Sequence, residues 1–145
     1  VWRRMKVIAD TNVLARAILQ DDEAQCRMAR DLLKQATLIA VPLPCLCELV
    51  WILRQGAKLP KEDVAVAIRA LLNTDTVVVN RPAVEAGLAL LDAGGDFADG
   101  IIAHEGKWLG GETFVSFDRK AAALLSKQGE SVRLLSQRDP PHGSA

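Results

Sequence analysis

The chain of 145 residues has no tyrosine, only three phenylalanines and three tryptophans, and no long hydrophobic run. Its longest stretch without a charged side chain covers residues 35–47, a length of 13 positions that includes two prolines. A membrane-spanning helix needs about 20 apolar residues, so we expect none. The first ten residues, VWRRMKVIAD, contain no apolar signal core. We therefore expect a cytoplasmic location rather than secretion.

A net charge of either sign is also missing. The 18 basic side chains balance the 18 acidic ones, whereas generic binding to nucleic acid usually shows as a basic excess. This balance does not exclude a nucleic-acid substrate, because opposite charges can be separated on the surface.

Cys45 and Cys47 have the wrong spacing for a CxxC redox or zinc motif. We expect the three cysteines to be free thiols in a reducing compartment.

Half of the residues are apolar and a quarter are charged, which is typical of a globular protein. The length corresponds to about one domain and is sufficient for a hydrophobic core. We expect a single domain over residues 5–135, an N-terminal extension at 1–4, and a flexible tail at 136–145 that contains two prolines.

Short apolar segments alternate with longer segments of helical spacing. Helices are predicted over 21–36, 60–73 and 82–91, and a further helix ends before Gly110. Alternating strands and helices predict the α/β class, with a parallel sheet between two layers of helices. The five predicted strands are residues 6–9 (KVIA), 38–41 (LIAV), 76–79 (TVVV), 113–116 (TFVS) and 131–134 (SVRL).

Two of these strands are followed by an aspartate. Asp10 comes directly after KVIA, and Asp118 comes two residues after TFVS. The carboxyl ends of parallel strands meet at one edge of a sheet, which is where ligands bind in open α/β folds. An aspartate in this position also caps the following helix. For Asp10, capping and a functional role are both open.

Glu48 is the only charged residue in the apolar segment 43–53, LPCLCELVWIL. Helical packing is expected to bury most of this segment, including Trp51, and Trp108 is likewise expected in the core. Burying an unpaired carboxylate costs several kcal/mol. Glu48 is therefore expected either to pair with a lysine or arginine or to bind a cation.

A third acidic segment, DFADGIIA, covers residues 96–103 and follows two glycines. Asp96 is in a suitable position to cap a helix that begins there, and capping alone would explain it. Asp99 lies three residues later, on the same side of the first turn. Capping explains Asp99 less well, because an apolar helix face follows it.

Together, these patterns place four carboxylates at one edge of the predicted sheet. Four carboxylates cannot share a small pocket in the ionised state unless cations balance them. Oxygen ligands without histidine or cysteine favour Mg²⁺ or Mn²⁺ over zinc, and such ions support phosphoryl chemistry. The sequence contains no P-loop, GxGxxG, GxSxG or HExxH motif. The four residues are Asp10, Glu48, Asp99 and Asp118.

This combination of motifs resembles the PIN-domain ribonucleases, and most closely the VapC-like toxins of bacterial type II toxin–antitoxin modules. The resemblance rests on Asp10-Thr11-Asn12 after the first strand, Glu48 in CELVW, DFADGIIA at 96–103 and FVSFDRKA at 114–121. It extends over residues 5–135. It implies a three-layer α/β/α sandwich around a central parallel sheet of four or five strands, and cleavage of RNA that depends on Mg²⁺ or Mn²⁺.

The resemblance also implies roles for individual residues. Asp10, Glu48 and Asp99 would be the main catalytic and metal-binding acids, and Asp118 would be the fourth. The number of bound ions is left open. Auxiliary positions that orient water or acids would be Asn12, Asp96 and Ser116.

The partners implied by the resemblance are an RNA substrate, a second copy in a homodimer, and a cognate antitoxin. The antitoxin would lay a helix on an apolar groove, for which residues 13–19 and 21–36 are candidates. Arg16, Arg119 and Lys120 are candidates for RNA phosphate contacts, and a solvated charged surface is the alternative for each. The scarcity of aromatic residues argues against a stacking platform for single strands and favours recognition of folded RNA by shape.

Two other functions are compatible with parts of the pattern. A different Mg²⁺-dependent phosphoryl-transfer enzyme of the haloacid-dehalogenase type would need an aspartate where Asn12 stands. A non-catalytic RNA- or protein-binding module would retain the acids without divalent-dependent chemistry.

Overall fold

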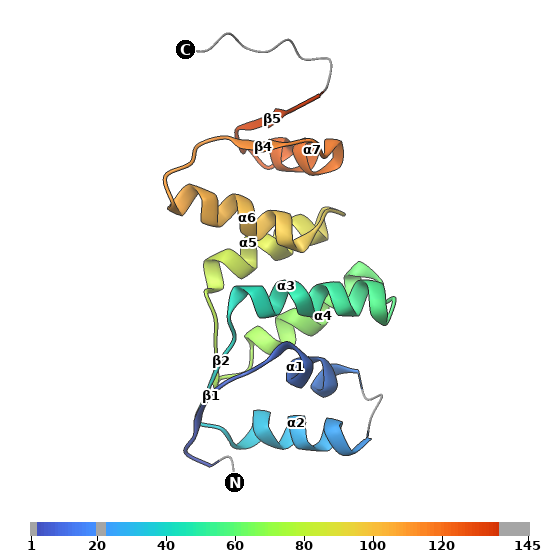
Figure 1. The fold of residues 1–145 in the computed structure, drawn as a ribbon, viewed down its shortest axis with the longest axis vertical. Coiled ribbons are helices and arrows are strands. Elements are labelled where there is room, and N and C mark those ends of the chain that lie inside the picture. Colours follow the sequence, from blue (N-terminus) through green and yellow to red (C-terminus); the bar gives the residue numbers. More distant parts are fainter. Residues whose placement is uncertain (1–2, 20–22, 137–145) are drawn as a thin grey trace.

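The computed structural model describes residues 3–19 and 23–136, arranged as an elongated stack of helices (Figure 1). Three strands run along one side of the stack, and two more lie near the end that holds the last described residues. The order of the elements is β1 (Lys6–Ile8), α1 (Thr11–Ile18), α2 (Glu23–Gln35), β2 (Leu38–Ala40), α3 (Leu43–Trp51), the π-helical segment η1 (Ile52–Gly56), α4 (Lys61–Leu72), β3 (Val77–Val78), α5 (Arg81–Asp92), α6 (Phe97–Trp108), β4 (Phe114–Ser116), α7 (Arg119–Lys127) and β5 (Val132–Leu134).

All five predicted strands are present, each within the predicted segment. Helices α1, α5 and α7, each of which follows a strand, begin where a side chain caps them. Asp10, Asn80 and Asp118 each accept a hydrogen bond from a main-chain N–H in the first turn of α1, α5 and α7. These caps satisfy N–H groups that have no partner inside the helix. Helix α7 itself was not among the predicted helices.

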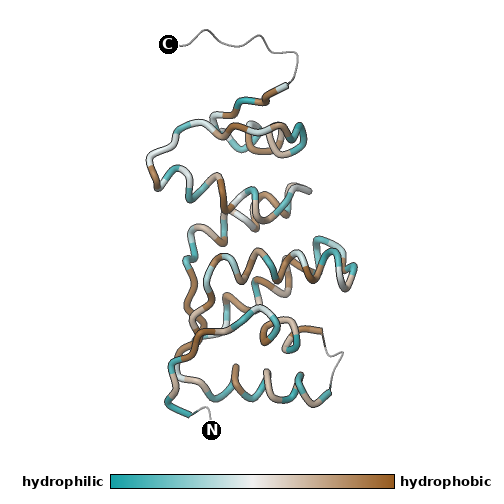
Figure 2. Tube along the Cα trace, in the orientation of Figure 1, coloured by the Kyte–Doolittle hydropathy of each residue, from teal (hydrophilic) through white to brown (hydrophobic). Residues whose placement is uncertain are grey.

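The core forms around α3. Leu46 and Leu49 on this helix and Leu53 of the adjoining η1 are fully buried, and Ile39 of β2 is buried with them. Removing a side chain of this size from water stabilises the fold by about 1.5–3 kcal/mol. The hydropathy colouring in Figure 2 shows the apolar residues on the strands and on the inner faces of the helices. Within the described ranges, no helix has the length and apolarity that crossing a bilayer requires.

The five strands are all parallel, as predicted, and they form two sheets. Strands β1, β2 and β3 pair in the order β1-β2-β3, with Lys6 opposite Leu38 and Ile39 opposite Val77. Strands β4 and β5 pair separately, with Phe114 opposite Val132. The α/β class and the strand number agree with the prediction. The single central sheet is divided because, in the part described, β1 and β4 are not hydrogen-bonded to each other.

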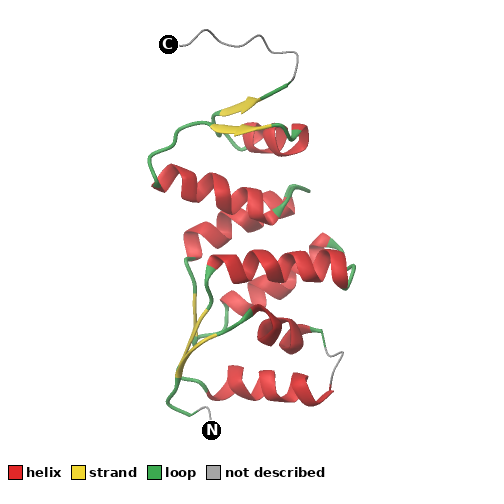
Figure 3. Ribbon diagram, viewed as in Figure 1, coloured by secondary structure: helices red, strands yellow, loops and turns green. Residues whose placement is uncertain are grey.

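The helices cover one face of the three-stranded sheet more than the other (Figure 3). Ile39 is buried against the helices, while Ile8 is 79% and Val78 51% exposed on the opposite face. Successive side chains of a strand point to opposite faces. One face of this sheet therefore retains apolar residues in contact with solvent.

The helix pair α5 and α6 connects the two sheets and is packed very closely. A Cβ atom on Gly100 would lie 2.5 Å from the carbonyl oxygen of Ala86 and 2.8 Å from the Cα of Gly87. Only glycine fits at such a close approach of two main chains. Lys107 of α6 forms an ion pair with Glu130, which precedes β5, at 2.8 Å. The two-stranded sheet is thereby attached to α6.

Candidate active site

Asp10 and Glu48 lie beside one pocket, of about 330 Å³, at the end of β1. Asp10 caps α1 by accepting a hydrogen bond from the Thr11 N–H at 2.8 Å. The buried Thr11 hydroxyl donates to Glu48 Oε2 at 3.1 Å. Thr11 therefore connects the acid on the strand end with the acid on α3. Sequence reasoning missed Thr11, although its place directly after Asp10 was a usable indication.

The pKa of the Cys45 thiol reflects the same arrangement. Burial raises this pKa most, the hydrogen bond from Thr11 acts in the opposite direction, and the negative charges of Asp10 and Glu48 raise it further. The two carboxylates therefore act on the same thiol. Cys26, Cys45 and Cys47 are free, as predicted.

Three predictions of burial were wrong, two for residues of α3 and one for a residue of α6. Glu48 is exposed rather than buried, and its partner in the described part of the chain is Thr11 rather than a lysine or arginine. Trp51 is 65% exposed, and Trp108 at the end of α6 is 79% exposed. The apolar character of both segments did not reveal that these particular helix faces are uncovered.

Asp96, Asp99 and Asp118 form a second acidic group, in a different pocket of about 320 Å³. Asp96 and Asp118 cap α6 and α7 by accepting hydrogen bonds from the N–H groups of Ala98 and Ala121. Asp99 is half-buried. Burial raises its pKa, and the charges of Asp96 and Asp118 raise it further. Asp99 is therefore a carboxylate whose charge a cation would stabilise.

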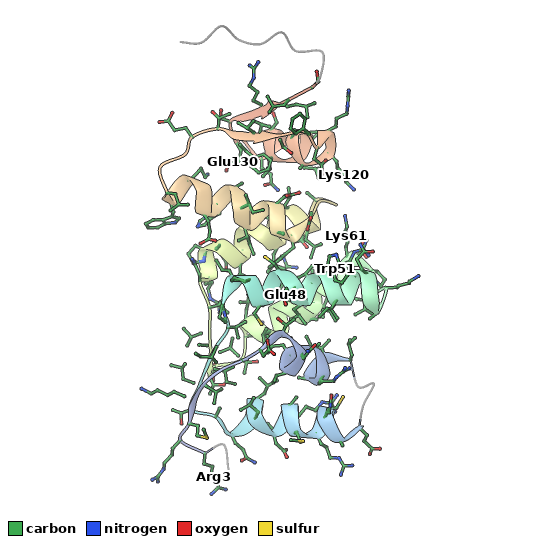
Figure 4. The ribbon with its side chains drawn as sticks, in the orientation of Figure 1. Arg3, Glu48, Trp51, Lys61, Lys120 and Glu130 are labelled. Atoms are coloured by element: carbon green, nitrogen blue, oxygen red, sulfur yellow. The ribbon has the colours of Figure 1, made fainter. Side chains whose placement is uncertain are left out.

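Three basic side chains line this second pocket together with the acids. Arg54 comes from η1, Lys61 from the start of α4 and Lys120 from α7. Figure 4 shows Lys61 and Lys120 on the same side of the molecule. Partial burial lowers the pKa of Lys61, and the charges of Lys120 and Arg54 lower it further. Positive charge is thus concentrated beside Asp99 and Asp118.

Only Lys120 of these three cations was predicted. Lys61 donates a hydrogen bond to the Gly94 carbonyl, and Arg54 donates to the Leu59 carbonyl at 2.8 Å. These contacts fix both residues at the mouth of the pocket. No short sequence motif contains Arg54 or Lys61. The chain segment between α3 and α4 places these two residues beside the acids of the pocket, which lie much later in the sequence.

The other predicted residues lie in several places. Ser116 Oγ accepts a hydrogen bond from the Asp118 N–H at 2.9 Å, so it orders the turn that presents Asp118. Asn12 and Arg16 line a groove between α1 and α2, away from both acidic pockets, and Arg16 donates to Gln25 at 2.9 Å. Arg119 is exposed and does not line either acidic pocket.

The structure therefore separates the four acids that were predicted to converge. Cys45 and Glu48 of α3 line one pocket, whereas Cys47 and Val50 of α3 line the other together with Arg54 of η1 and residues of α6. Residues three or four apart share a helix face, so the two pockets use different faces of the same helix. Over residues 3–19 and 23–136, no three His, Cys, Asp or Glu side chains form a group that could hold a metal ion.

Each acidic group nevertheless has the donor chemistry of a hard cation site. Carboxylate and hydroxyl oxygens are the only polar side-chain groups that Asp10, Thr11 and Glu48 offer, and Mg²⁺ and Mn²⁺ prefer oxygen ligands. Asp99 is crowded by two further carboxylates. Each acidic group therefore offers ligands of the type that such an ion prefers, but only part of a ligand set.

The chain matches the PIN domain family over residues 7–125. This match includes all four acids and both pockets, and the chain belongs to the PIN domain family. PIN domains are typically metal-dependent nucleases, which generally use Mg²⁺ or Mn²⁺ and bind RNA. No curated protein matches the chain.

Proposed function

We propose that this protein is an endoribonuclease that depends on Mg²⁺ or Mn²⁺. The observation that carries this proposal is the crowding of Asp99 by Asp96 and Asp118 in a pocket lined by three basic side chains. Clustered carboxylates need a cation, and a polyanionic substrate needs positive charge beside them. This combination suits the hydrolysis of a phosphodiester.

In this proposal, Asp10, Glu48, Asp99 and Asp118 bind the metal, and Thr11 and Ser116 orient Glu48 and Asp118. Bound Mg²⁺ or Mn²⁺ would activate water and stabilise the negative charge that develops on the phosphate and leaving oxygens. Arg54, Lys61 and Lys120 would hold RNA phosphates.

We further propose that the protein is a VapC-like toxin, acting in the cytoplasm as a homodimer with one PIN domain over residues 5–135. A cognate antitoxin would occupy the groove of about 360 Å³ between α1 and α2, which Val13, Met28 and Leu32 line. The lining of this groove is mostly apolar, as an amphipathic helix requires. A basic antitoxin side chain would neutralise the acids. A Met28→Asp substitution, which puts a charge into the groove, should then weaken neutralisation by the antitoxin without changing RNA cleavage.

The direct test uses purified, antitoxin-free protein on total cellular RNA. Discrete cuts that need Mg²⁺ or Mn²⁺, disappear with EDTA and are lost in Asp10→Asn are expected, and sequencing of the new 5′ ends would identify the target. Intact RNA with folded wild-type protein would contradict the proposal.

One observation favours a second candidate, a non-catalytic RNA-binding module. The separation of the acids leaves, in the described residues, no three-ligand metal site. This alternative predicts that Asp10→Asn and Asp99→Asn bind RNA as tightly as the wild type, and that divalent ions leave the RNA intact.

A further inference from the structure

Trp51 places an exposed aromatic ring in the pocket that contains Asp99 and Asp118. It is the last residue of α3, it is 65% exposed, and it lines this pocket. Leu46 and Leu49 of the same helix are fully buried and supply its contacts with the core. The indole ring therefore contributes little to the core and is available to a ligand in the pocket.

The main chain around Trp51 is helical on both sides. The π-helical segment η1 continues directly from α3, and the Ala57 N–H donates to the Ile52 carbonyl at 3.0 Å at its end. π-helical turns are rare and occur frequently at functional sites. A tryptophan side chain has only two torsion angles, so ordering it against a ligand costs little entropy. The ring is thus presented to the pocket from a fixed main chain.

The same pocket is lined by three cations. Arg54 lies three residues after Trp51, and Lys61 and Lys120 reach the pocket from α4 and α7. Figure 4 shows Trp51, Lys61 and Lys120 on one side of the molecule. Burial lowers the pKa of Lys61, and the charges of Lys120 and Arg54 lower it further. A bound phosphate would offset this repulsion between like charges.

An aromatic ring beside several cations suits a nucleotide whose base is unpaired. The base stacks on the ring while the cations bind the sugar–phosphate backbone. In a double helix, neighbouring base pairs already cover both faces of each base, so the ring has no access to them. The pocket has a volume of about 320 Å³, which is typical of a site for a small ligand. It therefore suits one unpaired nucleotide rather than a duplex.

The surroundings of Trp51 favour RNA over a protein partner. The centres of protein–protein interfaces are depleted in charged residues, whereas three cations and three carboxylates line this pocket. The mostly apolar groove between α1 and α2 has the lining that an antitoxin helix requires, and Trp51 does not line it. Charge and apolar character thus assign the two surfaces to different partners.

We propose that Trp51 stacks on an unpaired RNA base while Arg54, Lys61 and Lys120 bind the adjacent phosphates. The substrate class is then RNA with an unpaired nucleotide at the cleavage site, in a single strand or in a loop of a folded RNA. Every base has an aromatic face, so Trp51 selects the pairing state of the base and not its identity. The cleavage part of this inference rests on the proposed nuclease function, and the stacking does not.

Tryptophan fluorescence tests the stacking directly. With Trp2→Phe and Trp108→Phe, Trp51 is the only tryptophan in the chain, and Asp10→Asn is added to keep the RNA intact in Mg²⁺. Single-stranded oligouridine should quench the Trp51 emission to saturation, and the same strand annealed to oligoadenosine should not. Equal quenching by the duplex, or no quenching by a single strand that binds, would overturn the inference.

Affinity measurements separate the ring from the cations. In the Asp10→Asn background, Trp51→Ala should weaken the binding of labelled oligouridine by a factor of about 5–150, as expected for one stacked base. Trp51→Phe should retain most of the affinity. The salt dependence should stay as steep in Trp51→Ala, which removes no charge, and become less steep in Lys120→Ala. Full affinity in Trp51→Ala would contradict the stacking.

The matched control is Trp108→Ala. Trp108 is 79% exposed at the end of α6 and does not line the pocket, so its removal should leave oligouridine binding unchanged. Light scattering then compares the masses of Trp51→Ala and the wild type, which should be equal. A change in oligomeric state with Trp51→Ala would assign the ring to a contact between proteins and reject its role in RNA binding.

Cleavage kinetics connect the inference to the proposed function. In the protein without Asp10→Asn, Trp51→Ala should raise KM for single-stranded RNA and change kcat far less, because the ring contacts the base rather than the reacting phosphate. If the wild type cleaves and Trp51→Ala has the same KM, the stacking falls and the nuclease function stands. If the wild type does not cleave but the fluorescence and affinity results are as expected, the stacking stands and the proposed function falls.

Discussion

Two glycines of α6 should respond in opposite ways to the same substitution. Gly100→Ala puts a Cβ atom 2.5 Å from the Ala86 carbonyl oxygen and 2.8 Å from the Gly87 Cα, which are main-chain atoms of α5 that cannot turn away. Overpacking of this kind costs about 1–3 kcal/mol. Alanine recovers about 1 kcal/mol of helix propensity relative to glycine. We expect a net loss of up to about 2 kcal/mol in the free energy of unfolding.

The control is Gly106→Ala in the same helix. A Cβ atom there would meet nothing within 4 Å, so only the gain in helix propensity remains, and we expect stabilisation by about 0.5–1 kcal/mol. Urea denaturation of the two variants and the wild type measures both effects, with equal m-values as the sign of an unchanged unfolded state. Equal stability of the two variants would refute the close α5–α6 packing.

Further predictions concern the acids. Asp99→Asn should raise the free energy of unfolding at neutral pH, because the raised pKa of Asp99 means that its charged form opposes folding. This gain should vanish as the pH falls below the ordinary aspartate pKa of about 3.9, where Asp99 is protonated in both states. Denaturation at several pH values measures the gain, and a gain that stays constant with pH would contradict the reasoning. Adding Mg²⁺ to metal-stripped protein should raise Tm by linkage, less so in Asp99→Asn, and an unchanged wild-type Tm would argue against a metal site. Thr11→Val should cost about 0.5–1.5 kcal/mol through the lost hydrogen bond to Glu48, while Thr11→Ser should retain most of it. Expression without antitoxin should stop growth and Asp10→Asn should restore it; an equally toxic variant would contradict the proposed site.

The local structure followed closely from the sequence. The short β-branched segments form strands because they are apolar and bounded by polar or helix-starting residues, as in TVVV before the Asn80 cap. The aspartates at strand ends cap helices, as Asp10 and Asp118 do. These features depend on a few neighbouring residues, so a linear pattern contains the information.

The arrangement of these elements was less predictable. Alternating strands and helices predict parallel pairing, but nothing in the sequence of β1 or β4 specifies whether they pair with each other or remain edges. The same limit applies to the site. Arg54 and Lys61 reach the pocket of Asp99 through a turn between two helices, and such long-range proximity leaves no local motif. The exposure of Glu48 also depends on which elements cover α3.

The most direct test of the central claim, that both acidic groups serve one metal-dependent nuclease, is a double-mutant comparison of cleavage rates. Asp10→Asn, Asp99→Asn and the double variant are assayed with saturating Mg²⁺ on the RNA that the wild type cleaves. Residues that act in one catalytic unit are strongly non-additive. The account predicts that each single variant is severely impaired and that the double variant is no slower than the worse single one. Wild-type rates in Asp99→Asn, or losses that multiply in the double variant, would contradict it.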